Sequence, residues 1–258
     1  MKNLFDLSGK VAVVTGASSG LGKDAAKAYA QYGADVALLA RRKDKLDDVA
    51  REIEAMNRKV LAVACDVTKE DDVNSAVQQV MNTFGKIDIL LNNAGVAVRG
   101  AVDELSMEDW NKAWNTNVTS IYLTGKYIIP HMKAQKYGKI VNVASINAII
   151  ADKVPELFRH SYNATKAAVR GLTMGMAASY ASFNITVNSV GPGLFLSEMT
   201  ENTLFKHQGF MQTYNALNPS GRPGAPGELN GTIIYLSSDA SAYVNSQHII
   251  VDGGIAVV

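Results

Sequence analysis

Seven short runs of apolar residues, many of them β-branched, recur along the chain. Their apolar positions are consecutive rather than alternate, which is typical of strands covered on both faces of a parallel sheet. The runs lie at residues 10–16, 34–40, 59–67, 87–95, 138–145, 184–193 and 247–254. Between them are longer segments with apolar residues at helical spacing, at 21–32, 43–57, 70–84, 107–133 and 162–182. The pattern predicts an α/β fold in which a doubly wound, seven-stranded parallel sheet is flanked by helices.

The alternation of strand and helix continues without a linker rich in Pro, Gly or Ser. We therefore expect a single domain, residues 1–258. Residues 194–222 depart from the rhythm, because they are apolar at helical intervals but bracketed by Gly and Pro. They are interpreted as a helical lid over a substrate at the ends of the strands, or alternatively as a static helical hairpin that completes the core.

Composition and charge narrow the kind of partner. Hydrophobic residues make up 47% of the chain and charged residues 19%, as in a compact globular protein. Lys and Arg number 25 against 24 Asp and Glu, so the net charge favours neither nucleic acid nor an anionic membrane. The expected partner is a small-molecule substrate.

The only cysteine, Cys65, cannot form an internal disulfide. The chain shows neither a cleavable leader nor a run of about eighteen apolar residues, so we expect a cytoplasmic location and no membrane span. The four histidines have no metal-ligand spacing with acids or with Cys65, and no metal is expected.

The first predicted strand runs into TGASSGLG, residues 15–22, and then into a helix. Glycines allow a sharp turn and a close approach to a pyrophosphate, and the N-terminal end of the following helix attracts negative charge. The spacing is neither that of the standard dinucleotide fingerprint nor that of an NTPase phosphate loop, so a kinase or ATPase is not expected. The alternative is a tight connection without a ligand.

Tyr162 and Lys166 are four residues apart at the start of an alanine-rich helical segment, so both side chains lie on one face of the helix. A phenol with an ordinary pKa near 10 exchanges protons poorly at neutral pH. A neighbouring ammonium stabilises the phenolate and would lower the pKa of Tyr162. The spacing taken alone also arises by chance.

Five motifs occur in order: TGASSGLG, NNAG (92–95), Ser145 after a strand, YNATK (162–166), and Pro192-Gly193. In this order they resemble the classical short-chain dehydrogenase/reductase family along essentially the whole chain. PGLFLSEMT (192–200) and the C-terminal region look most similar to the gluconate 5-dehydrogenase-like branch. The resemblance implies a Rossmann-type fold and an NAD(P)-dependent oxidoreductase. It also implies a homo-oligomer, a tetramer or dimer, for which segments 167–183 and 255–258 offer apolar faces.

The resemblance implies a catalytic role for four residues. Tyr162 would exchange the proton, and Lys166 would acidify Tyr162 and bind the nicotinamide ribose. Ser145 would hydrogen-bond the substrate oxygen. Asn117 would hold a water of the proton relay, with Asn115 as a rival; a polar side chain satisfied inside a helix is the alternative for Asn117.

An acidic residue at the end of the second strand would bind the ribose hydroxyls of NAD(H). Here Ala40 ends the strand and Arg41 and Arg42 follow, whose guanidinium groups suit the 2′-phosphate of NADP(H). Solvated surface charge is the alternative, and Asp44 lies nearby. Asp66 resembles the family's adenine-binding aspartate, or else is a helix cap.

The expected cofactor-binding set follows the family motifs. It comprises Gly16, Ser18, Ser19, Gly20, Leu21, Gly22, Arg41, Arg42, Asp66, Val67, Asn93, Ala94, Gly95, Tyr162, Lys166, Pro192, Gly193, Leu194 and Ser197.

The substrate class stays open at this stage. The loop between Ser145 and Tyr162 is longer than is usual in the family, and Arg159, His160 or Arg99 could hold a carboxylate; solvated surface is the alternative for each. The branch resemblance favours a sugar acid or polyol. The apolar residues of the 194–222 segment instead suit a hydroxysteroid: Phe195, Leu196, Met199, Leu204, Phe205, Phe210, Met211 and Tyr214. A non-catalytic nucleotide-binding regulatory protein is a more distant alternative.

Overall fold

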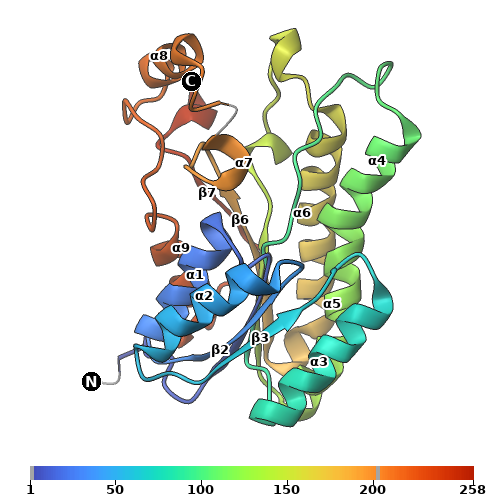
Figure 1. Ribbon diagram of the computed structural model, residues 1–258, viewed down its shortest axis with the longest axis vertical. Helices are drawn as coiled ribbons and strands as arrows, with labels where there is room; N and C mark the ends of the chain where they lie inside the picture. Colours follow the sequence, from blue (N-terminus) through green and yellow to red (C-terminus); the bar gives the residue numbers. More distant parts are fainter. Residues whose placement is uncertain (1–2, 202–203) are drawn as a thin grey trace.

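The computed structural model describes residues 3–201 and 204–258. Within them, seven parallel strands form one sheet in the order β3-β2-β1-β4-β5-β6-β7 (Figure 1). The strands are β1 Val11–Thr15, β2 Asp35–Ala40, β3 Val60–Ala64, β4 Ile89–Asn92, β5 Gly138–Val143, β6 Ile185–Pro192 and β7 His248–Val251. The predicted doubly wound, single-domain α/β fold is confirmed. The central strands are buried at every position, as consecutive apolar residues require when both faces of a sheet are covered.

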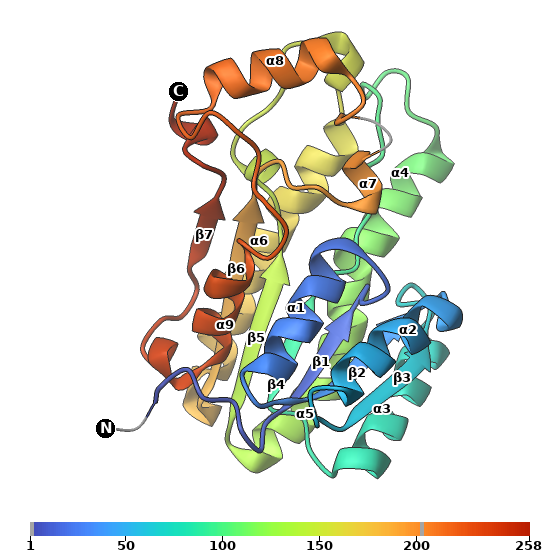
Figure 2. The same ribbon diagram turned by 60° about the vertical axis from the view of Figure 1, so that its left-hand side comes forward.

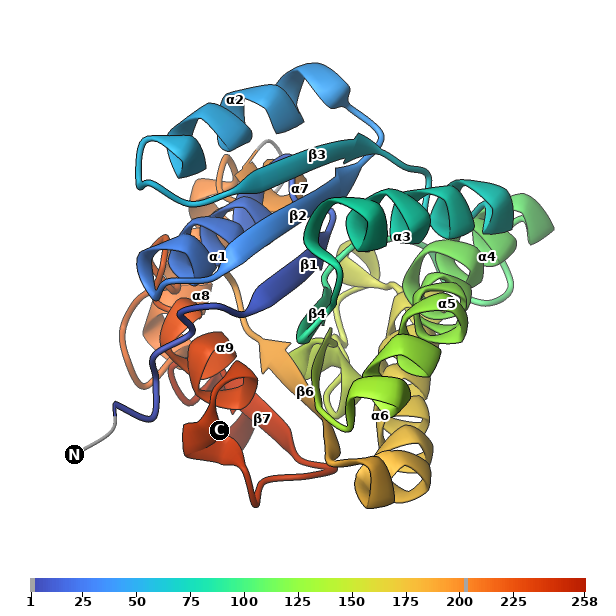
Figure 3. The same cartoon turned by 90° about the horizontal axis from the view of Figure 1, so that it is seen from below.

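Helices cover both faces of this sheet, and Figure 3 shows the two layers. α1 (Gly20–Gln31), α2 (Lys43–Glu54) and α9 (Asn230–Ser237) pack on one face. α3 (Glu70–Phe84), α5 (Ser120–Gln135) and α6 (His160–Tyr180) pack on the other. Each face has its own hydrophobic core, and the sheet lies between the two.

The strand order reverses between β1 and β4, which lie side by side in the sheet. In an open parallel sheet, the chains leaving two such strands diverge to opposite faces and leave a crevice at their carboxyl ends. The TGASSGLG and NNAG motifs follow β1 and β4, so the fold brings both motifs to this crevice. Figure 2 shows this end of the sheet at the top, below α7 (Glu198–Glu201) and α8 (Gln208–Leu217).

Two predicted helical segments differ in detail from the structure. Segment 107–133 is α4 (Met107–Trp114) and α5, joined by a π-helical turn at Asn115–Thr119. The predicted lid segment contains α7 and α8, whereas residues 202–203 within it lie outside the described residues. Extra residues inserted as π-turns are frequent at functional sites, and this one carries Asn117.

Candidate active site

A cleft of about 1050 Å³ opens at the carboxyl ends of the central strands. The residues that follow four different strands line it, namely Gly16 after β1, Asn93 after β4, Ser145 after β5 and Gly193 after β6. Each of these positions belongs to a motif singled out in the sequence.

The glycine loop between β1 and α1 is built tightly against the loop after β4. Gly16 and Gly20 have φ angles of +66° and +53°, in the left-handed region that favours glycine. A Cβ on Gly22 would lie 2.3 Å from Nδ2 of Asn93, so a larger residue would force the two loops apart. Gly22 therefore lets the glycine loop pack directly against Asn93.

Asn93 and Thr15 join the two loops. Asn93 Nδ2 donates to the carbonyl oxygens of Thr15 and Gly16, at 3.0 and 3.2 Å. In return, Thr15 Oγ1 accepts from the backbone N–H groups of Asn93 and Ala94, at 3.0 and 3.1 Å. Asn93 thus serves as a brace between the loops, and Gly95 follows it along the cleft wall.

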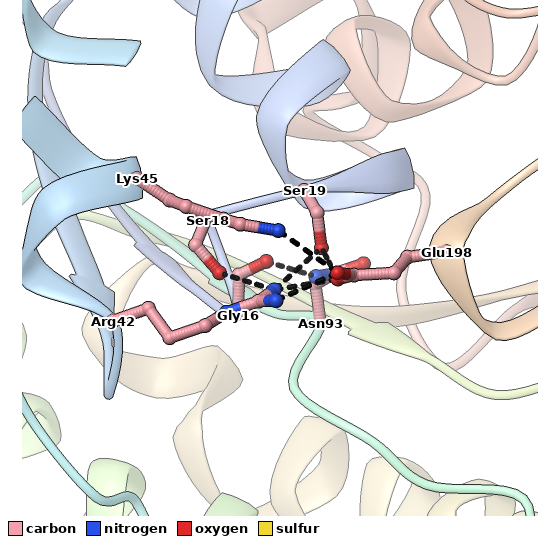
Figure 4. A network of polar contacts seen from close by, with 7 residues as sticks. All are labelled: Gly16, Ser18, Ser19, Arg42, Lys45, Asn93 and Glu198. Atoms are coloured by element: carbon pink, nitrogen blue, oxygen red, sulfur yellow. Dashed lines mark hydrogen bonds and ion pairs between the residues drawn. The ribbon is translucent and has the colours of Figure 1, made fainter. Parts of the chain in front are cut away.

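Arg42 and Glu198 form the core of a polar network beside the glycine loop (Figure 4). Its Nη2 is 3.2 Å from the hydroxyl oxygens of both Ser18 and Ser19. The guanidinium also holds the carboxylate of Glu198, with Nη1 to Oε1 at 2.6 Å and Nη2 to Oε2 at 2.5 Å. Lys45 Nζ and Ser19 Oγ donate to the same carboxylate, at 2.9 and 2.8 Å. Hydrogen bonds from Arg42, Lys45 and Ser19 hold the pKa of Glu198 well below its ordinary value.

Arg41 follows β2 and lines the cleft, and Asp66 lies two residues after β3. Burial alone would raise the pKa of Asp66, but hydrogen bonds from Thr68 and the positive charge of Arg41 outweigh it, and the pKa lies below its ordinary value. Asp66 Oδ1 accepts from Thr68 N and Oγ1, at 3.0 and 2.7 Å, two residues on. Asp66 therefore stabilises the turn before α3, whose N-cap residue is Lys69, and the cap alternative is wrong. Asp66 and Val67 also line the cleft.

Ser145, Tyr162 and Lys166 meet in the cleft wall. Tyr162 lies in the first turn of α6, and Lys166 lies one turn further on the same side. The buried Lys166 ammonium is 5.6 Å from the centroid of the Tyr162 ring and donates to the carbonyl of Val143 at 2.8 Å. Ser145 follows Val143 by two residues, so the end of β5 brings its hydroxyl to the same place.

Burial dominates the electrostatics of this pair. It raises the pKa of Tyr162, while hydrogen bonding with Ser145 and the positive charge of Arg159 act in the opposite direction. It also lowers the pKa of Lys166 to about 8. The expected acidification of the phenol is therefore not found in this structure, because removal from water disfavours the phenolate and the ammonium alike.

Asn117 is buried in the π-helical turn behind the cleft. Its Oδ1 accepts from Val96 N at 2.8 Å, and its Nδ2 donates to Val96 O and Thr165 Oγ1, at 2.9 and 3.0 Å. Asn117 thereby ties the loop after β4 to α6. Its rival Asn115 is exposed and lines the cleft itself.

The loops at the mouth of the cleft pair with each other through Gly100 and Arg159. Gly100 N donates to Phe158 O at 2.8 Å, and His160 N donates to Gly100 O at 3.2 Å. This pairing holds the backbones at Arg99 and Arg159 close together. Arg99 is exposed and lines the cleft.

His160 takes a structural role, because its Nδ1 accepts from Val102 N at 3.0 Å. The long loop after Ser145 is held to α6 by Asn163, whose Nδ2 donates to the carbonyl oxygens of Asn147 and Ile150, at 2.9 and 2.8 Å.

Among the apolar residues of segment 194–222, Phe195 lines the cleft. Phe210 and Tyr214 stack on one another in α8, with ring centroids 6.0 Å apart, and Tyr214 Oη accepts from Leu194 N at 3.4 Å and from Asn218 at 3.0 Å. The side chain of Met199 lies outside what the structure describes. Phe210 and Tyr214 are thus engaged with each other and with their own segment.

Comparison with known proteins agrees with this geometry. The family model for short chain dehydrogenase matches residues 10–207. The chain belongs to the short-chain dehydrogenase family. It is therefore an NAD(P)-dependent oxidoreductase that acts on CH–OH groups.

Individual relatives of this short-chain dehydrogenase cover its whole length. It is 40% identical to gluconate 5-dehydrogenase of Gluconobacter oxydans, over 99% of this chain and 98% of the relative. A gluconate 5-dehydrogenase from Burkholderia cenocepacia, in complex with NADP and tartrate, superimposes with a TM-score of 0.93 at 33% identity, over 99% and 98% of the two chains. L-sorbose reductase of Gluconobacter frateurii, complexed with NADPH and L-sorbose, gives a TM-score of 0.90 at 33% identity, over 99% and 100%.

Most of the site residues predicted from the motifs line the cleft of this short-chain dehydrogenase. Gly22, Leu194 and Asn117 pack behind its wall, and the other predicted residues line it. Sequence reasoning missed Lys45 and Glu198 of the Arg42 network. It also missed Asn163, although this residue lies inside the YNATK motif and its position there was a usable signal.

No helix in the described part of the chain is long and apolar enough to cross a membrane. The described residues also include no group of three or more His, Cys, Asp or Glu side chains placed to hold a metal ion.

Proposed function

We propose that this enzyme transfers hydride between NADP(H) and a secondary alcohol or ketone of a sugar acid or polyol, with Tyr162 exchanging the proton. The observation that carries the proposal is the meeting of Ser145, Tyr162 and Lys166 in the same cleft as the glycine loop and Arg42. An alcohol–ketone interconversion needs a proton at the substrate oxygen and hydride at the attached carbon. The same cleft holds Tyr162, which can exchange the proton, and the glycine loop, which can hold the hydride-carrying cofactor.

The residues of the cleft fit a dinucleotide. Gly22 leaves no room for a Cβ, and the helix α1 begins at Gly20 with its first N–H groups directed to the loop. Arg42, Ser18 and Ser19 offer donors for a 2′-phosphate, and Ala40 supplies no carboxylate to repel it. Two similar structures, one in complex with NADP and the other with NADPH, support the same preference.

The bound cofactor supplies or accepts the hydride. In reduction, Tyr162 donates its proton to the substrate oxygen, and the Ser145 hydroxyl donates a hydrogen bond that stabilises the negative charge forming there. The Lys166 ammonium, 5.6 Å from the ring centroid, stabilises the phenolate that remains. Asn117 acts at a distance from the substrate by holding Val96 and Thr165.

The substrate is proposed to be a sugar acid or polyol for two reasons. Several similar proteins are named for sugar or sugar-acid substrates, among them gluconate 5-dehydrogenase, 5-keto-D-gluconate 5-reductase and L-sorbose reductase. The mouth of the cleft also carries the exposed Arg99, whose guanidinium suits a carboxylate or several hydroxyls. The guanidinium of Arg159 instead pairs with Asp152, at 3.4 Å, and donates to Leu157 O. A hydroxysteroid stays the alternative, which the apolar surface of Phe195 and Leu196 would favour.

The proposal is tested by steady-state rates with NADPH and NADH on 5-ketogluconate, sorbose and a panel of ketosteroids. We expect NADPH to be preferred and the sugar derivatives to be reduced.

The role of Tyr162 is tested with the variant Y162F, which removes only the phenolic oxygen. We expect kcat to fall by roughly 10²- to 10⁴-fold, while the affinity for NADPH, followed by fluorescence, changes little. Retained activity in Y162F, or turnover of ketosteroids alone, contradicts the proposal.

A further inference from the structure

Glu198 occupies an anion site that other parts of the chain build. Its carboxylate accepts hydrogen bonds from Arg42, Lys45 and Ser19, which lie more than 150 residues earlier in the sequence (Figure 4). The segment before it is seated on the glycine loop, since Ser197 Cβ would lie 3.1 Å from a Cβ on Gly20. This seat directs Glu198 across the loop to Arg42.

The donors around Glu198 are those of a phosphate site rather than of an ordinary surface ion pair. A guanidinium fork, an ammonium and the Ser19 hydroxyl converge on the carboxylate from the loop after β1 and from the start of α2, and the Ser18 hydroxyl accepts from the same guanidinium. A phosphate monoester has three acceptor oxygens and nearly two negative charges, whereas Glu198 brings two oxygens and one charge. The carboxylate therefore satisfies these donors only in part.

We propose that Glu198 is an internal competitor for the 2′-phosphate of NADP(H), and that Lys45 joins Arg42 as the second cation of the phosphate subsite. This inference rests on the proposed NADP(H) preference. Because the same N–H and O–H groups serve both anions, and because the two anions repel each other, the phosphate binds when Glu198 leaves. NAD(H) carries a hydroxyl at that position and does not displace the carboxylate, so Glu198 weakens NADP(H) binding selectively.

The experiment measures binding of 2′,5′-ADP and of ADP to the wild-type enzyme and to E198Q by isothermal titration calorimetry. We expect E198Q to bind 2′,5′-ADP at least about fivefold more tightly than the wild-type enzyme does, because the phosphate no longer has to displace a carboxylate from its ion pairs. We expect the gain in affinity for ADP to be at least about threefold smaller than the gain for 2′,5′-ADP. E201Q is the matched control: it removes the same charge from α7, but Glu201 takes no part in the network of Figure 4, and we expect it to behave as wild type.

Three other results would contradict the inference. Equal gains for the two ligands would mean that Glu198 acts as a general repulsive charge, and unchanged or weaker binding of 2′,5′-ADP by E198Q would mean that it is no competitor; both overturn the inference. If the wild-type enzyme and E198Q both bind ADP as tightly as 2′,5′-ADP, the NADP(H) preference itself is wrong and the inference falls with it.

Lys45 is tested in the same assay. We expect K45Q to bind 2′,5′-ADP about threefold more weakly and ADP unchanged, because one charged donor to the phosphate is lost. Lys43 pairs with Asp47 on the same helix, so K43Q is the control for loss of a cation from α2. If K45Q and K43Q weaken 2′,5′-ADP binding equally, Lys45 is not part of the phosphate subsite.

Discussion

Tyr162 and Lys166 show how two residues acquire their chemistry from burial. Tyr162 has a pKa above its ordinary value, and the pKa of Lys166 falls to about 8, in both cases mainly because burial disfavours the charged form. The Lys166 ammonium lies 5.6 Å from the centroid of the Tyr162 ring. A proton that leaves the phenol leaves a phenolate beside the ammonium, which is the arrangement that the proposed mechanism uses.

Removing the charge of Lys166 should change the pH profile of alcohol oxidation. In K166M, we expect the rising limb of kcat/KM, measured at saturating NADP⁺, to move to higher pH, because burial then raises the pKa of Tyr162 without an opposing ammonium. Each unit of displacement lowers the rate at neutral pH about tenfold. K166R keeps the positive charge and should keep the limb near its wild-type position; a limb that stays in place in K166M would contradict the role of Lys166.

At the level of whole elements, the active-site loops are held by hydrogen bonds to rigid helices. Asn117 in the π-helical turn holds the loop after β4, and Asn163 in α6 holds the long loop after β5. The pairing of Gly100 with Arg159 then joins the two loops to each other. The mouth of the cleft therefore depends on a few polar anchors rather than on an apolar core.

Loss of the Asn163 anchor should loosen the mouth of the cleft. N163A removes two hydrogen bonds to backbone carbonyls, so we expect the free energy of unfolding to fall by about 1–2 kcal/mol. We also expect KM for the sugar substrate to rise several-fold, with a smaller change in kcat and in NADPH affinity. Urea unfolding and steady-state kinetics check both effects. Asn82, exposed on α3, provides the control N82A; equal behaviour of the two variants would refute the anchor.

At the scale of the whole molecule, the sheet separates two cores, and its edge strand β7 is held by polar as well as apolar contacts. The Nδ1 atom of His248 on β7 is hydrogen-bonded to Oγ of Ser189 on β6, at 2.9 Å. Burial, and secondarily the positive charge of Arg170, lowers the pKa of His248 to about 4. The neutral imidazole is thus the form that the fold accommodates.

This histidine predicts a loss of stability in mild acid. Below the ordinary pKa of 6.5, the unfolded chain binds a proton that the folded state does not take up until about pH 4. The free energy of unfolding should therefore fall as the pH drops from 6.5 to 4, by about 1–2 kcal/mol for a half-buried group. Urea unfolding at several pH values measures it, and H248N should flatten the dependence. An equally steep dependence in H248N would assign the effect to other groups.

The order of strands and helices, the parallel sheet and most of the cleft residues were predictable from the sequence, because apolar periodicity and motif spacing are local properties. The i,i+4 relation of Tyr162 and Lys166 is of this kind, as is the glycine loop. The contact of Glu198 with Arg42, the brace made by Asn93 and the sign of the pKa shift of Tyr162 were not. They depend on packing between segments distant in the chain and on exclusion from water, and only the folded molecule sets either of these.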